Sequence, residues 1–196
     1  MIRGFEEQFE RTTIRRIQSL LDRISKIHFA GCAASQYYKV DLDLCLRAGA
    51  LLGSLQVSAS LLEIVVRELE IDRISKDNRS QEAIFVNPQR ELEANRSKGF
   101  KEIVNNLRDA GLFNSGDAER AIEFYDCVRV PIHHGLPLRF VEKNTQQLEE
   151  AKLLAEILGS NLNDVGVGMH DFERAIEDHS LNLIETAISL IEKIVK

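Results

Sequence analysis

The residues best suited to chemistry gather in one segment, Arg129-Val130-Pro131-Ile132-His133-His134-Gly135. An imidazole, with a pKa of about 6.5, can donate or accept a proton near neutral pH, and a guanidinium keeps its charge and can bind two phosphate oxygens. Cleavage of RNA without a metal ion needs both kinds of group: one moves protons at the 2′-hydroxyl and the 5′-oxygen, and the other stabilises charge on phosphorus. Arg129 is the candidate for the guanidinium, and His134 and His133 are the candidates for the imidazole.

Spacing alone does not single out this pair. Three Arg/His pairs have four intervening residues: Arg23/His28, Arg129/His134 and Arg174/His179. Five positions along a regular helix rotate a side chain by about 500°, which leaves the members of the first and third pairs on different faces. Pro131 lies inside the second pair. We expect it to interrupt or end the helix that carries Arg129, so that the guanidinium and the imidazole can face the same space.

The same segment differs in charge from the rest of the chain. The 196 residues include 31 acidic and 25 basic side chains, and the net charge of −6 argues against a protein that coats nucleic acid or anionic membrane through bulk charge. From Cys127 to Val141 there is no acidic residue, although the average composition would place about two there. This window therefore has a net positive charge within an acidic chain, which suits a small anion-binding site.

Other catalytic and targeting signals are absent. The sequence contains no phosphate-binding glycine loop, GxSxG, HExxH or calcium loop, and its three cysteines form no CxxC pair. We therefore expect neither a cofactor nor a metal ion, while the adjacent histidines leave a metal site as an alternative. No apolar run is long enough to span a bilayer and no signal-peptide pattern is present, so we expect a soluble cytoplasmic protein that binds no membrane.

Apolar residues recur at helical spacing along nearly the whole chain, and no period-two alternation lasts long enough for a sheet. We predict a single all-α domain, an up-down bundle of five to six helices. In it, residues 1–40 form an N-terminal helix and a connection, and residues 41–196 form the bundle. The expected helices are 4–29, 41–75, 87–110, one that begins at 114–117, 144–158, and one that begins at 171.

Cap residues predict where these helices begin and end. Side chains that can accept a hydrogen bond from the first turn stand at five expected starts: Asp41, Asn87 (followed by Pro88), Asn114, Asn144 and Asp171. Gly111 is placed to end its helix in the left-handed conformation, with Leu112 as the apolar residue that closes the end.

The helix from Asn87 to Ala110, the segment Leu107–Phe113, the helix from Asp117 and the segment Arg129–Gly135 together resemble the HEPN-type helical domains, over roughly Leu42 to Lys196. The resemblance implies a helical bundle, commonly dimeric. For many members it implies a metal-independent endoribonuclease, often a toxin or defence protein, with an Arg-x4–6-His motif at the dimer interface. It assigns the motif positions to Arg129 and His134; His133, with three intervening residues, does not fit this spacing and is the second choice.

A single chain supplies only half of a site with two histidines, so this interpretation predicts an isologous homodimer with a composite site. RNA would be the substrate, and a cognate antitoxin or a regulatory protein would be a further partner.

Two other interpretations remain open. Active members usually have a polar residue, most often Asn, directly after the arginine; Val130 stands there in this chain and favours a non-catalytic HEPN-like module for dimerisation or partner binding. In a purely structural interpretation, Arg129 bonds carbonyls at a helix end, and His134 satisfies a buried polar partner beside the Pro/Gly turn.

Overall fold

The protein is helical throughout the part of the chain that the structure, a computed structural model, describes: residues 11–29, 33–79, 98–134 and 169–195. No strand occurs in these ranges, and the prediction of an all-α bundle is confirmed. The helices are α2 (Arg11–Lys26), α3 (Ala33–Arg47), α4 (Leu51–Arg79), α6 (Phe100–Asp109), α7 (Ser115–Phe124), the π-helical turn η1 (Tyr125–Arg129), α8 (Val130–His134) and α12 (Met169–Ile194). The predicted helix 144–158 and the caps Asn87 and Asn144 lie outside the described residues.

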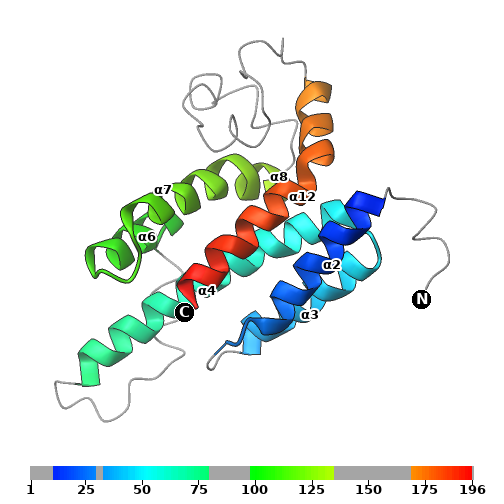
Figure 1. Cartoon of the computed structure of the whole chain (residues 1–196). Coiled ribbons are helices and arrows are strands. Elements are labelled where there is room, and N and C mark those ends of the chain that lie inside the picture. The colour runs from blue at the N-terminus through cyan, green and yellow to red at the C-terminus, as the bar shows by residue number, and fades with distance from the viewer. Residues whose placement is uncertain (1–10, 30–32, 80–97, 135–168, 196) are drawn as a thin grey trace.

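α4 is the central element of the bundle (Figure 1). α3 and α12 lie along it, α6 and η1 pack against it, and α2 contacts both α3 and α12. Apolar side chains occur around most of the circumference of α4, as expected for a helix that is covered on several sides. None of the described helices combines the length and the apolar character needed to cross a membrane.

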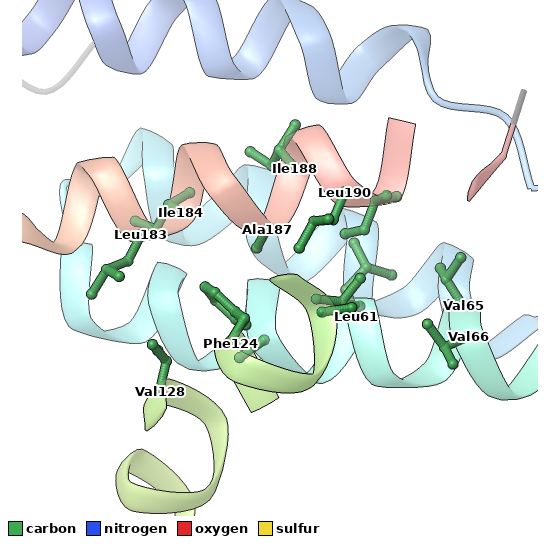
Figure 2. Packing of buried hydrophobic residues seen from close by; sticks show 14 of the residues in the cluster. Leu61, Val65, Val66, Phe124, Val128, Leu183, Ile184, Ala187, Ile188 and Leu190 are labelled. Atoms are coloured by element: carbon green, nitrogen blue, oxygen red, sulfur yellow. The ribbon is translucent and has the colours of Figure 1, made fainter. Parts of the chain in front are cut away.

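One part of the core, which extends through all the longer helices, lies where α7 and η1 meet α4 and α12. Figure 2 shows Phe124 pointing from the end of α7 into the space between these two helices, near Leu61 of α4 and Leu183 and Ala187 of α12. All four side chains are almost completely buried. Burial of a side chain the size of leucine or phenylalanine contributes about 1.5–3 kcal/mol, so this contact fixes the α7–η1 segment against α4.

The prediction of one helix from residue 41 to residue 75 is wrong. The chain forms two helices there, and Asp41 lies inside α3 instead of capping its start. Gly49 has a φ of +72°, and the amides of Gly49 and Ala50 donate to the carbonyls of Leu46 and Cys45. This is the hydrogen-bond pattern of a glycine-terminated helix, and it turns the chain so that α4 can return along α3 (Figure 1).

The predicted end of α6 and start of α7 are both confirmed, but the prediction of one helix from 87 to 110 is wrong, because Gly99 has an extended backbone (φ −66°, ψ 149°) and α6 begins only at Phe100. Gly111 has a φ of +73°, and its amide and that of Leu112 donate to the carbonyls of Arg108 and Leu107, at 2.9 Å each. Asn114 then caps α7, because its Oδ1 accepts a hydrogen bond of 2.8 Å from the amide of Asp117. The last helix is confirmed as well, but it begins at Met169, so Asp171 lies inside its first turn and the prediction of Asp171 as its cap is wrong.

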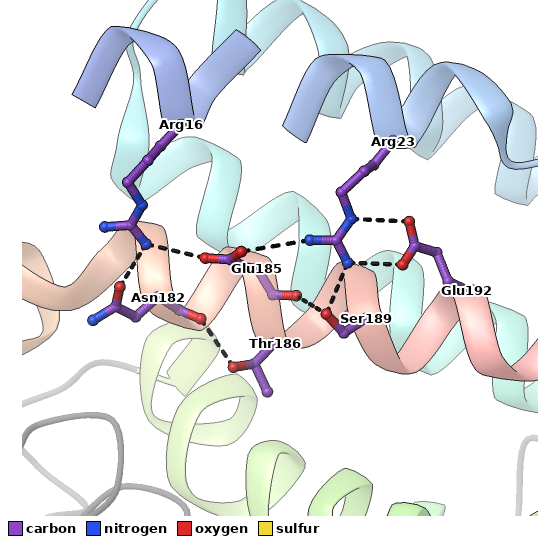
Figure 3. Close-up of polar contacts among 7 residues, drawn as sticks. All are labelled: Arg16, Arg23, Asn182, Glu185, Thr186, Ser189 and Glu192. Atoms are coloured by element: carbon purple, nitrogen blue, oxygen red, sulfur yellow. Dashed lines mark hydrogen bonds and ion pairs between the residues drawn. The ribbon is translucent and has the colours of Figure 1, made fainter. Parts of the chain in front are cut away.

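A polar contact row joins α2 to α12 (Figure 3). The guanidinium of Arg23 donates to both carboxylate oxygens of Glu192, at 3.0 and 2.7 Å, and to the Ser189 hydroxyl at 2.8 Å. About two helical turns earlier on α2, Arg16 donates to Asn182 at 2.6 Å and to Glu185 at 3.1 Å. The N-terminal helix is thus held to the bundle by paired charges as well as by its buried stripe of Ile17, Leu20 and Ile24.

Candidate functional site

The helix that carries Arg129 continues past the proline instead of ending there. α7 passes into the π-helical turn η1 and then into α8, which extends through Pro131 to His134. Pro131 has no amide hydrogen to donate, so an ordinary α-helix would lose a hydrogen bond at this position. The wider π turn precedes it, with the amide of Val130 donating to the carbonyl of Tyr125, five residues back. The change in register that we expected from Pro131 is therefore made inside a continuous helix.

Arg129 is directed at the central helix. Its Nε lies 2.8 Å from Oε2 of Glu63 on α4, and the side chain is 20% exposed. The buried Nε–H is not aligned with an acceptor, so charge, and not a well-formed hydrogen bond, holds this pair. The guanidinium carbon lies 5.5 Å from the centre of the Tyr125 ring, within the range of a cation–π contact.

Glu63 is shared between two arginines. Its Oε1 accepts hydrogen bonds from Nε and from a terminal nitrogen of Arg67, at 3.0 and 2.9 Å. Arg67 also donates to the backbone carbonyl of Lys98 at 3.3 Å, which ties the segment just before α6 to α4. Two positive charges and one negative charge therefore meet beside η1, which leaves a net charge of +1 among these three side chains.

His133 lies one helical turn after Arg129 and also faces α4. Its Nε2 is 3.0 Å from the hydroxyl of Ser60, three residues before Glu63. Ser60 is only 9% exposed, so its hydroxyl serves to orient the ring and is poorly placed to act as a nucleophile. The structure thus brings Arg129 and His133 to one stretch of α4. The backbone of His134 lies in α8, but its side chain is outside the described part of the structure.

Sequence reasoning missed the residues on α4 that complete this cluster. Ser60, Glu63, Arg67 and Glu70 follow one another at intervals of three, four and three, which places them on one face of the helix. A polar row at helical spacing within an otherwise apolar helix was the available signal. The window from Cys127 to Val141 has no acidic residue in the sequence, yet Glu63 supplies one to it in space.

The same face of α4 continues into a second charged group. Glu70 is fully buried and accepts hydrogen bonds from Arg73, at 2.7 and 3.0 Å, and from Asn106 at 3.3 Å, with Lys98 Nζ at 3.6 Å. Burial raises the pKa of this carboxyl, but the contacts with Arg73, Asn106 and Lys98 together outweigh burial and lower it below its ordinary value. Glu70 therefore stays ionised, and the contacts join α4 to α6.

Aromatic and thiol groups near the site are held in their neutral forms. Burial, followed by the charge of Glu63, raises the pKa of Tyr125, so its ring lies under Arg129 as a phenol. Burial raises the pKa of the Cys127 thiol to about 12. Within residues 11–29, 33–79, 98–134 and 169–195, no three histidine, cysteine or carboxylate side chains are placed to hold a metal ion.

Of the residues in the other two Arg/His pairs, the structure shows contacts for Arg23 and His179, while the side chain of Arg174 lies outside the described part. Arg23 is engaged with Glu192, and His179 Nδ1 lies 3.3 Å from the side-chain amide of Asn182 on its own helix. Around Arg129, the guanidinium and the imidazole of His133 both contact side chains of the central helix, Glu63 and Ser60. Comparison of the chain with protein-family models, with curated proteins and with solved structures gave no match.

Proposed function

We propose that the chain is a HEPN-like protein of the cytoplasm that cleaves single-stranded RNA without a metal ion. The observation that carries the proposal is the approach of Arg129 and His133 to one stretch of α4, from successive turns of the same helix. Guanidinium and imidazole are the two groups that this reaction needs, and they lie together in a structure that holds them by packing and by hydrogen bonds.

In the proposed reaction, a histidine removes the proton of the 2′-hydroxyl, and the 2′-oxygen attacks phosphorus. The bond to the 5′-oxygen then breaks, and a second acid returns a proton to the leaving oxygen. The products are a 2′,3′-cyclic phosphate and a free 5′-hydroxyl, so atoms and charge balance without an added reactant. Arg129 would stabilise the negative charge on the phosphate oxygens. His134 is the histidine that the motif assigns, and His133 is the one that lies beside Arg129.

The second acid would come from another copy of the chain. A homodimer with a twofold axis near α8 would face two Arg/His pairs across one RNA strand and supply two histidines to a composite site. This arrangement predicts that activity depends on protein concentration around the dissociation constant of the dimer. It also predicts that adding an excess of His134→Ala chains lowers the activity per wild-type chain, because each mixed dimer has only one of the two histidines.

The test is cleavage of a labelled single-stranded RNA in EDTA, with end-group analysis of the products. Wild type is expected to leave 2′,3′-cyclic phosphate ends, and Arg129→Ala should abolish cleavage. His134→Ala and His133→Ala, made separately, identify the proton-transfer group. His28→Ala is the matched control, because His28 is exposed at the end of α2. Equal background cleavage by wild type, Arg129→Ala and both histidine variants would exclude the reaction.

A second function is favoured by the pairing of Arg129 with Glu63. A guanidinium that is already neutralised inside its own chain can serve packing alone, and the protein would then be a non-catalytic HEPN-like module that dimerises or binds a regulatory partner. This alternative predicts that dimerisation and partner binding survive in the Arg129→Ala/His134→Ala double variant. Growth inhibition on overexpression that disappears with His134→Ala would instead favour a toxin that a cognate antitoxin controls.

A further inference from the structure

We infer that Glu63 is a positioning residue for Arg129: it holds the Nε edge of the guanidinium against α4 and leaves the edge with the two terminal nitrogens for a phosphate group. The inference rests on the proposed function, because it assigns a ligand to the same site. It assigns to Glu63 a role that the sequence motif does not contain.

Glu63 is itself fixed in place. Both Nε and a terminal nitrogen of Arg67 donate to Oε1, and Arg67 reaches on to the carbonyl of Lys98. One oxygen of the carboxylate is thus occupied, and only Oε2 remains to face Arg129. Since the carboxylate group is planar and rigid, anchoring Oε1 also determines where Oε2 lies.

Arg129 is held at one edge and backed on one face. Oε2 of Glu63 lies 2.8 Å from Nε, and the ring of Tyr125 lies beneath the guanidinium. The terminal nitrogens of Arg129 hydrogen-bond to no residue in the described ranges. A guanidinium fixed in this way presents a fork of N–H groups in one direction, the geometry that binds two phosphate oxygens at once.

The charges around this fork agree with a phosphodiester as the ligand. Arg67 and Arg129 with Glu63 carry a net charge of +1, which balances the single negative charge of a phosphodiester between two nucleotides. The carboxylate does not compete for the terminal nitrogens, because its contact is with Nε. Glu63 therefore orients the receptor for the phosphate without occupying it.

Simple electrostatics and the positioning role predict opposite effects of Glu63→Gln. Removal of a negative charge beside a phosphate site strengthens anion binding if charge alone matters, and it frees Arg129 if Glu63 sequesters it. If Glu63 positions Arg129, the same change weakens binding, because the pair is held by charge and a neutral glutamine no longer holds Nε. The two explanations are separated by the sign of a single measurement.

The binding probe is a short fluorescein-labelled 2′-O-methyl RNA, which has phosphodiesters but no free 2′-hydroxyl. Its anisotropy is measured in EDTA with the 196-residue chain. We expect about tenfold weaker binding for Glu63→Gln and for Arg129→Lys, since either change removes one oriented charge-assisted contact. The double variant should lose no more than either single variant, because both break the same contact. Glu102→Gln is the matched control, an exposed glutamate on α6, and should bind like wild type.

A spectroscopic measurement tests the position of Arg129 without RNA. In a ¹H–¹⁵N spectrum of arginine side chains, the buried Nε–H of Arg129 should exchange slowly with water and should give a signal that is absent from Arg129→Lys. The signal should shift or disappear in Glu63→Gln and remain in Glu102→Gln. A signal that is unchanged in Glu63→Gln would overturn the positioning role.

The two proposals fail in different ways. If wild type neither cleaves RNA nor binds the probe, the proposed function fails. In a second outcome, wild type cleaves RNA and Arg129→Ala does not, but Glu63→Gln binds the probe and cleaves RNA at least as well as wild type. That outcome overturns only the role of Glu63. Urea unfolding of each variant shows that binding is compared between folded chains.

Discussion

Arg129 and Glu63 are 66 positions apart in the chain, yet Arg129 Nε and Glu63 Oε2 lie 2.8 Å apart where η1 packs against the middle of α4. The arginine that gives the sequence its motif is therefore also part of the packing between two helices. Because the pair is partly buried, replacing either residue acts on the free energy of unfolding as well as on chemistry. Experiments on this site therefore need to measure both the free energy of unfolding and the RNA-cleaving activity.

Arg129→Met is expected to lower the free energy of unfolding by about 1–2 kcal/mol. The methionine fills similar volume but leaves one side of Glu63 without its partner, although Arg67 still pairs with it. Urea unfolding at neutral pH measures the change. The control is Arg108→Met, which removes an exposed contact with the neighbouring Asp109 and should cost less than about 0.5 kcal/mol. Equal losses in the two variants would contradict the role of Arg129 in packing.

Glu70 should make the stability of the protein depend on pH. Its pKa is lowered in the folded state, so its contribution is fully present above the unfolded value of about 4.3 and is lost as the pH falls through the folded value. Glu70→Gln removes this contribution. The difference in unfolding free energy between wild type and Glu70→Gln should be largest at pH 7 and should shrink from about pH 5 downward. The difference between wild type and Glu102→Gln, an exposed residue, should stay small throughout, and a Glu70 difference that does not change with pH would contradict the prediction.

The helix ends show which parts of the fold could be predicted from the sequence. Gly111 and Asn114 act through hydrogen bonds within a few residues, and both were predicted correctly. Gly49 ends α3 by the same mechanism as Gly111, but the apolar pattern continues across it from α3 into α4. The uninterrupted apolar pattern therefore predicted one helix, although Gly49, two residues after Arg47, was the signal that the first helix ends.

The candidate site could be predicted only in part, for a related reason. Arg129 and His133 belong to one segment, and their types and spacing stand out in the sequence. Ser60 and Glu63 come from another helix, and which face of α4 meets η1 depends on packing across the whole bundle. Pro131 was expected to interrupt or end the helix, but a π turn before it lets the helix continue. The sequence did not predict this turn, because a π turn has no signature comparable to a cap residue.

Gly111→Ala is expected to destabilise the protein by about 1 kcal/mol, whereas Gly99→Ala should have no such cost. No atom lies within 4 Å of the position of a Cβ at either residue, so crowding does not distinguish them. Only Gly111 has a positive φ, +73°, which a side chain makes unfavourable. Thermal or urea unfolding of the two variants isolates the cost of the backbone conformation. A loss in Gly99→Ala as large as that in Gly111→Ala would show that another effect dominates.

Arg23 and Glu192 should show an interaction energy of about 1 kcal/mol in a double-mutant cycle. The contact has two parallel N–H···O bonds between side chains that are 26% and 30% exposed, and it raises the pKa of Arg23 through the hydrogen bond with Glu192. Arg23→Ala, Glu192→Ala and the double variant are compared by urea unfolding. The exposed pair Arg47 and Asp43 provides the control and should couple more weakly, because solvent screens it. Equal coupling in both pairs would mean that α2 is held mainly by its apolar stripe.

Ser60→Ala should lower the rate of RNA cleavage several-fold if His133 transfers the proton. The Ser60 hydroxyl is 3.0 Å from Nε2 of His133, and without it the exposed ring loses a contact that fixes its orientation relative to Arg129. Ser58→Ala is the matched control, because Ser58 lies on the same helix, is fully buried and donates to the carbonyl of Leu55. The pH dependence of kcat separates orientation from packing: loss of the hydrogen bond changes the apparent pKa of the histidine limb, whereas a packing defect changes only stability. A rate and a pH profile equal to those of Ser58→Ala would assign proton transfer to His134 instead.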